Sequence, residues 1–448
     1  MKKTLLLTMA LGVVAASDTM AQSDVYVTGS TAFRKQVFSA CQKLFQTGFQ
    51  TFTGTPTTGG DTATGSGAAQ WTMTGTPITA LTNVSSPLTI HGLFTGSVQG
   101  CQTVENRVKL LFLNSTGSQG VSNTPTIAFS DVSSVSTPYP ATGNFSEEPV
   151  AVQPFVMCHS VPLTTISNVS NEQLKYAIQI GRIPLSAWDN LTADHANFVY
   201  LLNRTQDSGT RRTAFAMEND AFITAQTVYN FDPTNHGFYK ATNVLQATSG
   251  GTSNGVSYGL IGPAGNGGAN LNWGSGYVGG GDIKTALAYG ASTGNSANTS
   301  IAYLSLADAQ GVTGVNWALV MSFNGLWPTT AGAGITAGTT TTNDFSPVCL
   351  GYYPFWATEV VVFPNVDPSS LSSDQNMSAT QLGDQSTPGT FLGVLDYQTK
   401  FSSPGGATLV GSLENEIQSS KTISPGATAI RLSDMTSSRG AVGGTIAP

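Results

Sequence analysis

Short apolar runs alternate along the chain with stretches in which apolar residues recur every three or four positions. Phe33, Val37 and Cys41 follow the second pattern, and further helices are predicted at 173–180, behind a capping box, and at 211–223. Strands are predicted at 25–28, 88–94, 126–129, 150–156, 198–203, 301–306, 317–323 and 358–363. Strands that alternate with helices predict an α/β fold with largely parallel sheets.

Three stretches of small polar residues interrupt this pattern. Residues 51–67 and 329–342 are rich in Thr and Gly, and residues 248–281 are rich in Gly, Ser and Asn. Such compositions are typical of long surface loops. No fixed-period repeat is present, and a chain of 448 residues is too long for one small core, so that more than one domain is expected.

Composition narrows the classes of function. Only 10% of the residues are charged, the net charge is -7, and small polar residues supply the polarity instead. A chain of this kind has no basic field for the phosphates of a duplex, so no nucleic-acid partner is expected. With 40% hydrophobic residues it can still bury a sizeable core.

The first residues have the order of a secretory signal. Met1-Lys2-Lys3 precedes an apolar run at 4–16, and Thr19-Met20-Ala21 is a small-x-Ala cleavage signal, which predicts a signal peptide over residues 1–21. No cysteine lies near that site and no later apolar run could span a bilayer. We therefore expect a soluble exported protein, periplasmic or secreted, without a lipid anchor.

The cysteines and histidines give weaker signals. Four cysteines, none in a CxxC motif, are compatible with up to two disulfides or with buried thiols, and the sequence leaves both open. The four histidines are scattered and lack metal-ligand spacing, so neither a metal nor another cofactor is expected.

Candidate chemistry lies at three turns where a strand runs into a helix. These turns are Gly29-Ser30-Thr31, the segment 96–100 and Ser208-Gly209-Thr210. Each presents free backbone N–H groups and the positive end of a helix dipole, which suit an oxyanion. One such turn is most often a plain cap, but three of them together with Arg204 and Asp131 indicate an oxyanion site.

These residues carry a family resemblance. The segment from Leu202 to Arg211, which reads LNRTQDSGTR, resembles the R-x-x-x-S-G-T signature of bacterial periplasmic phosphate-binding proteins, the solute receptors of Pst-type ABC transporters. Residues 28–33 are similar to the family's first phosphate loop, Gly96-Ser97 to its second, and 129–131 to its aspartate-bearing strand end. Together with similar segments at 171–188, 279–283, 301–305, 324–329 and 353–355, the resemblance spans about residues 25 to 365.

The resemblance implies a two-lobed periplasmic-binding-protein-like fold. Each lobe would be a mainly parallel sheet flanked by helices, with two crossings between the lobes and the anion buried in the cleft. Residues 22–155 and 355–448 would form lobe I, and residues 156–354 lobe II. On this fold Cys158 and Cys349 would lie near the crossings, and we expect them to pair with each other and Cys41 to pair with Cys101.

The resemblance also implies a site and a function. The phosphate-binding positions fall on Ser30, Thr31, Ala32, Phe33, Ser97, Asp131, Arg204, Ser208, Gly209 and Thr210. Arg204 would supply the full positive charge in a fork suited to paired oxygens. Asp131 would repel an anion that brings no proton, and so favour monohydrogen phosphate over sulfate.

The implied role is capture of inorganic phosphate by a monomer that serves an ABC permease and ATPase, not an enzyme activity. Gln206 stands where the family has an acid, and Asp207 where it has glycine, which would alter selectivity among tetrahedral oxyanions. A receptor for another small oxyanion therefore stays open, as does a secreted surface or matrix protein on the same scaffold, suggested by the low charge and the Thr/Gly stretches. Gly-x-Ser-x-Gly segments at 251–255, 255–259 and 290–294 would suit a hydrolase, but such segments arise by chance in Gly/Ser-rich tracts.

Overall fold

The fold is that of a computed structural model of the chain. It describes residues 23–54, 68–160, 163, 165–205, 207–217, 229–232, 237–240, 252–253, 256–257, 276–277, 279–288, 299–310, 320–330, 344–366, 377–396, 401–402, 408–409, 429–439 and 446–447. The predicted signal peptide, Gln206 and most residues of the Gly-x-Ser-x-Gly segments lie outside this set. Among the described helices none has the length and apolar character to cross a membrane.

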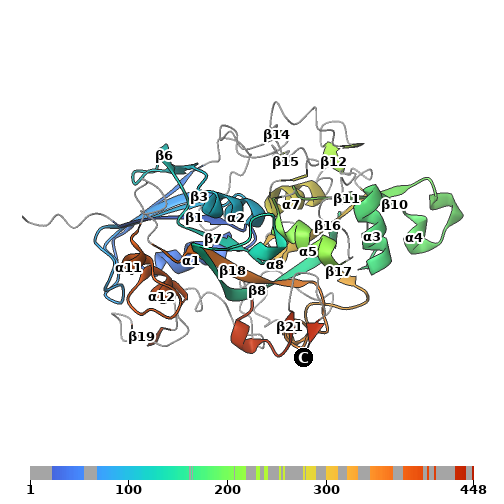
Figure 1. Ribbon diagram of the computed structural model, residues 1–448. Coiled ribbons are helices and arrows are strands. Elements are labelled where there is room, and N and C mark those ends of the chain that lie inside the picture. The colour runs from blue at the N-terminus through green and yellow to red at the C-terminus, as the bar shows by residue number, and fades with distance from the viewer. Residues whose placement is uncertain are drawn as a thin grey trace, which may run out of the picture.

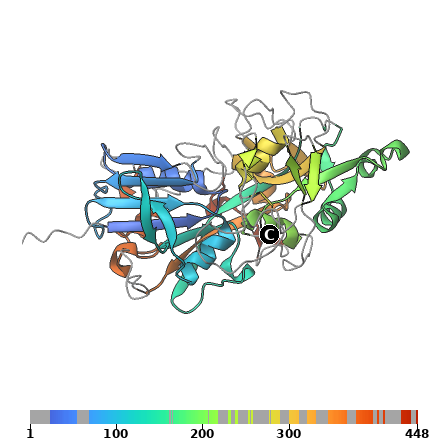
Figure 2. The same ribbon diagram turned by 90° about the horizontal axis from the view of Figure 1, so that it is seen from above.

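The N-terminal part of the chain forms half of a large sheet, drawn in blue in Figures 1 and 2. Its strands are β1 (Ser23–Gly29), β2 (Gln50–Gly54), β3 (Gln70–Gly75), β4 (Leu88–Leu93) and β7 (Ile127–Ser130). β1 is parallel to both β4 and β7, whereas β3 and β2 continue antiparallel to the edge. A hairpin of β5 (Leu110–Leu113) and β6 (Gln119–Asn123) packs beside β3 and β4.

Two helices cover opposite faces of this half, α1 (Arg34–Gln42) and α2 (Ser97–Glu105). Phe129 of β7 packs in one cluster with the apolar side chains of α1, and its neighbour Ala128 packs in another with Cys101 of α2. Alternate residues of a strand point to opposite faces, which lets the two helices pack on opposite sides. Because β1 and β4 are parallel, the turns before α1 and α2 lie at the same edge of the sheet, where the N–H of Gly96 donates to the carbonyl of Gly29 at 2.9 Å.

Seven further strands belong to the second half of the sheet. They are β9 (Asn168–Val169), β10 (Arg182–Pro184), β11 (Phe198–Leu202), β12 (Tyr229–Asp232), β13 (Gly237–Lys240), β16 (Ser300–Ser305) and β17 (Val320–Phe323). The helices are α3 (Asn171–Ile180), α4 (Ser186–Asp189), α5 (Gly209–Met217), α7 (Gly280–Ala288), α8 (Leu306–Gln310) and α9 (Ser346–Cys349). β11 is parallel to β12 and β16, and the capping box predicted at Ser170 begins α3.

Two long strands join the halves, β8 (Phe145–His159) and β18 (Trp356–Pro364). They pair antiparallel, and the last residues of β8 continue into a pairing with β16. On β8 the core changes between Ala151 and Val152, and on β18 between Ala357 and Val361. We call the part whose core contains Ala151 and Val361 lobe I, and the part whose core contains Val152 and Ala357 lobe II. The predicted two-lobed α/β fold with two crossings is confirmed, and Figure 1 shows β8 and β18 in the middle of the molecule.

The prediction of mainly parallel sheets holds for the strands at the centre of each lobe and not for the rest. The β2–β3 and β12–β13 hairpins make the edges antiparallel, and the crossing strands run against their neighbours β7 and β16. Antiparallel neighbours need no helical crossover between them, whereas parallel neighbours do.

After β18 the chain returns to lobe I. α11 (Ala379–Leu382) and α12 (Phe391–Asp396) place Leu382, Phe391 and Leu392 in its core. The 3-10 helices are η2 (Ser134–Ser136), η3 (Thr192–Asp194) and η6 (Leu432–Asp434). Two-residue strands form the pairs β14 (Thr252–Ser253) with β15 (Val256–Ser257), β19 (Phe401–Ser402) with β20 (Thr408–Leu409), and β21 (Ser438–Arg439) with β22 (Ile446–Ala447).

The predicted disulfides were wrong, because the structure joins none of the four cysteines by a disulfide. Cys41 and Cys101 lie on the helices that cover opposite faces of the lobe I sheet, which separates their sulfurs. Cys158 and Cys349 do share the lobe II core, as the fold implied, but as buried thiols. Burial raises the pKa of Cys101 and of Cys158 to about 12, which keeps these thiols protonated and unreactive.

Candidate anion-binding site

The first predicted turn closes on itself at the end of β1. The N–H of Ser30 donates to the carbonyl of Phe129 at 2.7 Å, and the hydroxyl of Ser30 accepts from the N–H groups of Ala32 and Phe33 at 3.2 and 3.3 Å. Ala32 also packs into the lobe II core. The N–H groups of Ala32 and Phe33 are thus engaged within the turn.

The second turn, before α2, touches lobe II. Gly96 has a φ of 129°, and a Cβ there would lie 2.6 Å from the carbonyl oxygen of Asp207, so a side chain could not be accommodated. The same carbonyl accepts a hydrogen bond from the N–H of Val98 at 3.0 Å. Glycine at this position therefore lets the start of α2 meet the loop that follows β11.

Asp131 is the acceptor at the centre of the predicted site and is 1% exposed. Its carboxylate accepts hydrogen bonds from the hydroxyl of Ser97 in lobe I and, at 3.0 Å, from the hydroxyl of Thr210 in lobe II. Burial raises the pKa of Asp131, and Ser97, Arg204 and Thr210 oppose that shift. The structure therefore brings residues from both lobes to this carboxylate.

Gly209 packs directly against the same carboxylate. A Cβ at this position would overlap with Oδ1 of Asp131 and lie 2.7 Å from the hydroxyl of Ser97. The neighbouring Ser208 places its hydroxyl at the start of α5, where it accepts from the N–H of Arg211 at 3.2 Å. The Ser208-Gly209-Thr210 turn thus closes over Asp131.

Arg204 is the predicted cation and is 2% exposed. Its Nη2 donates to the hydroxyl of Thr31 in lobe I at 3.1 Å, and its Nε donates to the carbonyl of Tyr277 at 3.3 Å. Burial lowers the pKa of Arg204, and the charges of Asp308 and then Asp131 oppose this most strongly. A buried guanidinium so placed is a strong donor to an oxyanion.

The backbone of Arg204 is held by a second set of contacts. Its N–H donates to the side-chain oxygen of Asn203 at 2.9 Å, and the Tyr303 hydroxyl donates to the same oxygen. The guanidinium of Arg211 donates to the carbonyl of Arg204 at 2.9 Å. These contacts orient the arginine from within lobe II.

The sequence did not identify an ion pair beside these residues, between Arg34 of α1 and Asp308 of α8. Their Nη2 and Oδ1 atoms are 3.9 Å apart and both side chains are buried. Asp308 also accepts from the hydroxyl of Ser305 at 2.9 Å. Asp308 gives Arg204 a nearby negative charge. The sequence held no pattern that pointed to Arg34 or Asp308.

The ten predicted residues therefore fall into two groups. In the first group Thr31 contacts Arg204, and Gly209 and Thr210 contact Asp131, in both cases between the lobes, while Ser97 contacts Asp131 within lobe I. The second group, Ser30, Ala32, Phe33 and Ser208, completes the turns at the starts of α1 and α5. Their proposed contacts with an anion are a matter of function and are taken up below.

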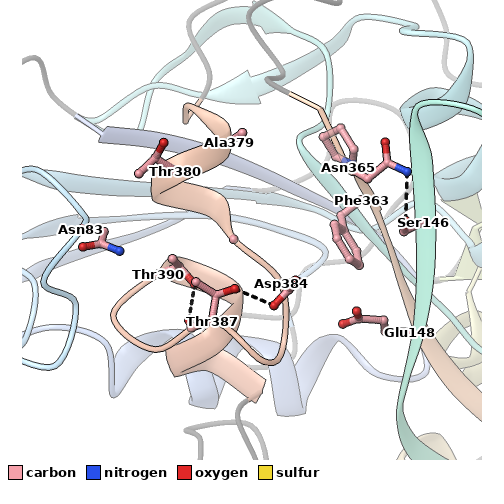
Figure 3. Close-up of a pocket in the computed structure, with 12 residues that line it drawn as sticks. Asn83, Ser146, Glu148, Phe363, Asn365, Ala379, Thr380, Asp384, Thr387 and Thr390 are labelled. Carbon is pink, nitrogen blue, oxygen red and sulfur yellow. Dashed lines mark hydrogen bonds between the residues drawn. The ribbon is translucent and has the colours of Figure 1, made fainter.

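A pocket of about 370 Å³ lies elsewhere, on lobe I between β18 and the α11–α12 segment (Figure 3). Glu148, Phe363 and Asp384 are among its lining residues, and none of the ten predicted residues is. Asp384 accepts from the side chains of Ser386 and Thr387, which lower its pKa. Its carboxylate is thus used to hold the loop before α12.

Comparison with known proteins gives matches to solved structures alone. No family model and no curated protein matches the chain. The chain is similar to phosphate-binding proteins of known structure. An ABC-type phosphate transport receptor from Vibrio cholerae is 10% identical over 78% of this chain and 90% of its own, with a TM-score of 0.36.

Two further similarities are of the same kind. A phosphate-binding protein from Stenotrophomonas maltophilia is 13% identical over 92% of this chain and 91% of its own, with a TM-score of 0.36. A human phosphate-binding apolipoprotein is 13% identical over 79% and 84% of the two chains, with a TM-score of 0.35. These similarities are distant, and the function proposed below rests on the residues of the site.

Proposed function

We propose that the chain is an exported solute-binding protein that captures monohydrogen phosphate between its lobes. One observation carries the proposal: a buried guanidinium from lobe II and a buried carboxylate from lobe I lie among hydroxyl groups from both lobes. Arg204 would bind anion oxygens, with Thr31, Ser97 and Thr210 as further donors. No metal or cofactor is part of this role.

The hydrogen bonds of Asp131 give a reason for phosphate in particular. Ser97 and Thr210 donate to Asp131, and each hydroxyl has one proton to donate. An anion that takes both donors deprives the carboxylate of its partners, unless it donates a proton in return. Monohydrogen phosphate can do so and sulfate cannot, and a buried unpaired acceptor costs about 1–3 kcal/mol or more when charged. Phosphate therefore returns one hydrogen bond to Asp131 and sulfate returns none, which favours phosphate.

Binding between the lobes also couples the ligand to the arrangement of the two lobes. An anion that contacts Arg204 and Asp131 together binds the closed arrangement better, so that it shifts the lobes toward closure. As part of the proposal, the closed monomer delivers phosphate to an ABC permease and its ATPase. The signal peptide over residues 1–21 and lobe boundaries at the crossing strands, near residues 155 and 354, belong to the same proposal.

A second candidate is a secreted surface or matrix protein that has kept the scaffold. The observation in its favour is that the site residues satisfy one another, since Asp131 occupies two hydroxyl donors and Ser30 occupies the N–H groups of the first turn. Another small oxyanion in place of phosphate is the third possibility.

Calorimetric titration of the mature protein separates these functions. The protein is stripped of bound anion by reversible unfolding and titrated in parallel with phosphate, sulfate and arsenate. One-to-one binding of phosphate with no response to sulfate supports the receptor. If the protein binds one of the other two oxyanions and not phosphate, that oxyanion replaces phosphate as the ligand. If it binds none of the three, the proposal is contradicted and the surface protein is favoured.

A further inference from the structure

A buried carboxyl group lies next to the proposed site and is not used by it. Glu359 is on the crossing strand β18, is 0% exposed, and has no hydrogen-bond partner for either carboxylate oxygen among the described residues. A carboxylate removed from water without a partner is strongly unfavourable, so the group must be neutral or must have a partner that arrives with a ligand.

Glu359 and Asp131 both lie at the end of the pairing between β18 and β7. Val360 is opposite Ser130 of β7 and Val361 is opposite Phe129 in this antiparallel pair. The pair ends at Val360 and Ser130, so that Glu359 and Asp131 are each the next residue along their own strand. At the same point the pairing of β18 with β8 shifts register between Glu359 and Val360.

Other charged groups are further along the neighbouring elements. β8 carries Glu148 opposite Val361 and Glu147 opposite Val362. The titratable side chains of α2 are Cys101, which packs with Val362, and Glu105 at the end of the helix. Burial first, and the charge of Asp131 second, raise the pKa of Glu359 well above its usual value. Asp131 is thus the charged group that acts on the pKa of Glu359.

We propose that Glu359 is a specificity-determining residue of the anion site, neutral while the anion is bound and able to expel it on ionisation. The inference rests on the proposed phosphate function. A neutral Glu359 adds no negative charge beside Asp131, which a proton-bearing anion can tolerate. An ionised Glu359 would put a second negative charge beside Asp131 and the bound dianion, and the three would repel one another.

The test compares phosphate affinity across alkaline pH in the wild type, Glu359→Gln and Glu148→Gln. Phosphate is already a dianion with one proton in this range, so a change in affinity reports the protein. We expect wild type and Glu148→Gln to lose about tenfold or more in affinity as pH rises. Glu359→Gln, which cannot ionise, should lose far less. Thermal unfolding checks that each variant is folded.

Difference infrared spectroscopy of wild type minus Glu359→Gln provides a readout that does not need the ligand. We expect a carbonyl band of a protonated carboxylic acid at neutral pH that is missing from the variant. If wild type binds phosphate but Glu359→Gln shows the same loss with pH, or the band is absent, the inference about Glu359 is overturned and the proposed function stands. If wild type binds no phosphate, both are overturned.

Discussion

The two lobes contribute opposite chemistry to the candidate site. Lobe I provides the acceptor Asp131 and the beginnings of α1 and α2, whereas lobe II provides the buried cation Arg204 and the turn at Gly209. Contacts cross between them at Thr31–Arg204, Asp131–Thr210, Val98–Asp207 and Arg34–Asp308. Arg204 and Asp131 come from different lobes, so the site that contains both exists only when the lobes meet.

The largest effect on phosphate binding is expected when the cation of lobe II is removed. Arg204→Ala should weaken phosphate binding more than about a hundredfold, because the variant loses the charge-assisted hydrogen bonds of a buried guanidinium to the anion. Calorimetric titration measures the loss. The control is Arg182→Ala in the same lobe, whose guanidinium lies 4.0 Å from the centre of the Phe198 ring, away from the site. Equal affinity in wild type and Arg204→Ala would refute the assignment.

A milder change alters the turn by which lobe II closes over lobe I. Gly209→Ala should destabilise the closed form by about 1–3 kcal/mol and weaken phosphate binding, because the added methyl overlaps with Asp131. Chemical unfolding and titration report the two effects. Gly281→Ala is the matched control, since a Cβ there meets its nearest atom only at 3.9 Å. If both alanines behave alike, Gly209 is not at a lobe contact.

The acceptor of lobe I should govern selectivity rather than affinity alone. Asp131→Asn replaces the charge by a group that can donate, so we expect sulfate binding to increase about tenfold while phosphate binding falls. Parallel titrations with the two anions give the ratio. An unchanged ratio would mean that Asp131 holds Ser97 and Thr210 in place and does not choose the ligand.

The smallest expected effect concerns the ion pair between the lobes. A double-mutant cycle of Arg34→Gln and Asp308→Asn should show a coupling of about 1 kcal/mol in the free energy of unfolding, since the charges are buried but 3.9 Å apart. The coupling should be larger with phosphate bound if closure brings the two together. Purely additive effects would show that this pair does not join the lobes.

Prediction from the sequence succeeded where local chemistry decides the outcome. The helix after β1, the capping box at Ser170 and the strand ends at Ser130 and Leu202 all have signals within a few residues. The disulfides failed because their pairing depends on which face of a sheet each helix covers, and no local pattern encodes that. Glu359 and Asp308 were not identified because each is a single acid in an apolar segment.

The sequence by itself determined the alternation of strands and helices, the glycines at the turns, and the presence of a cation and an acid at the ends of two strands. Only the tertiary structure decided that these two meet, because they belong to separate lobes joined by β8 and β18. It also placed Glu359 and Asp131 each one residue beyond the last pair of β18 and β7. Charge and hydrogen bonding act over a few ångströms, and distances between segments so far apart along the chain are set by packing.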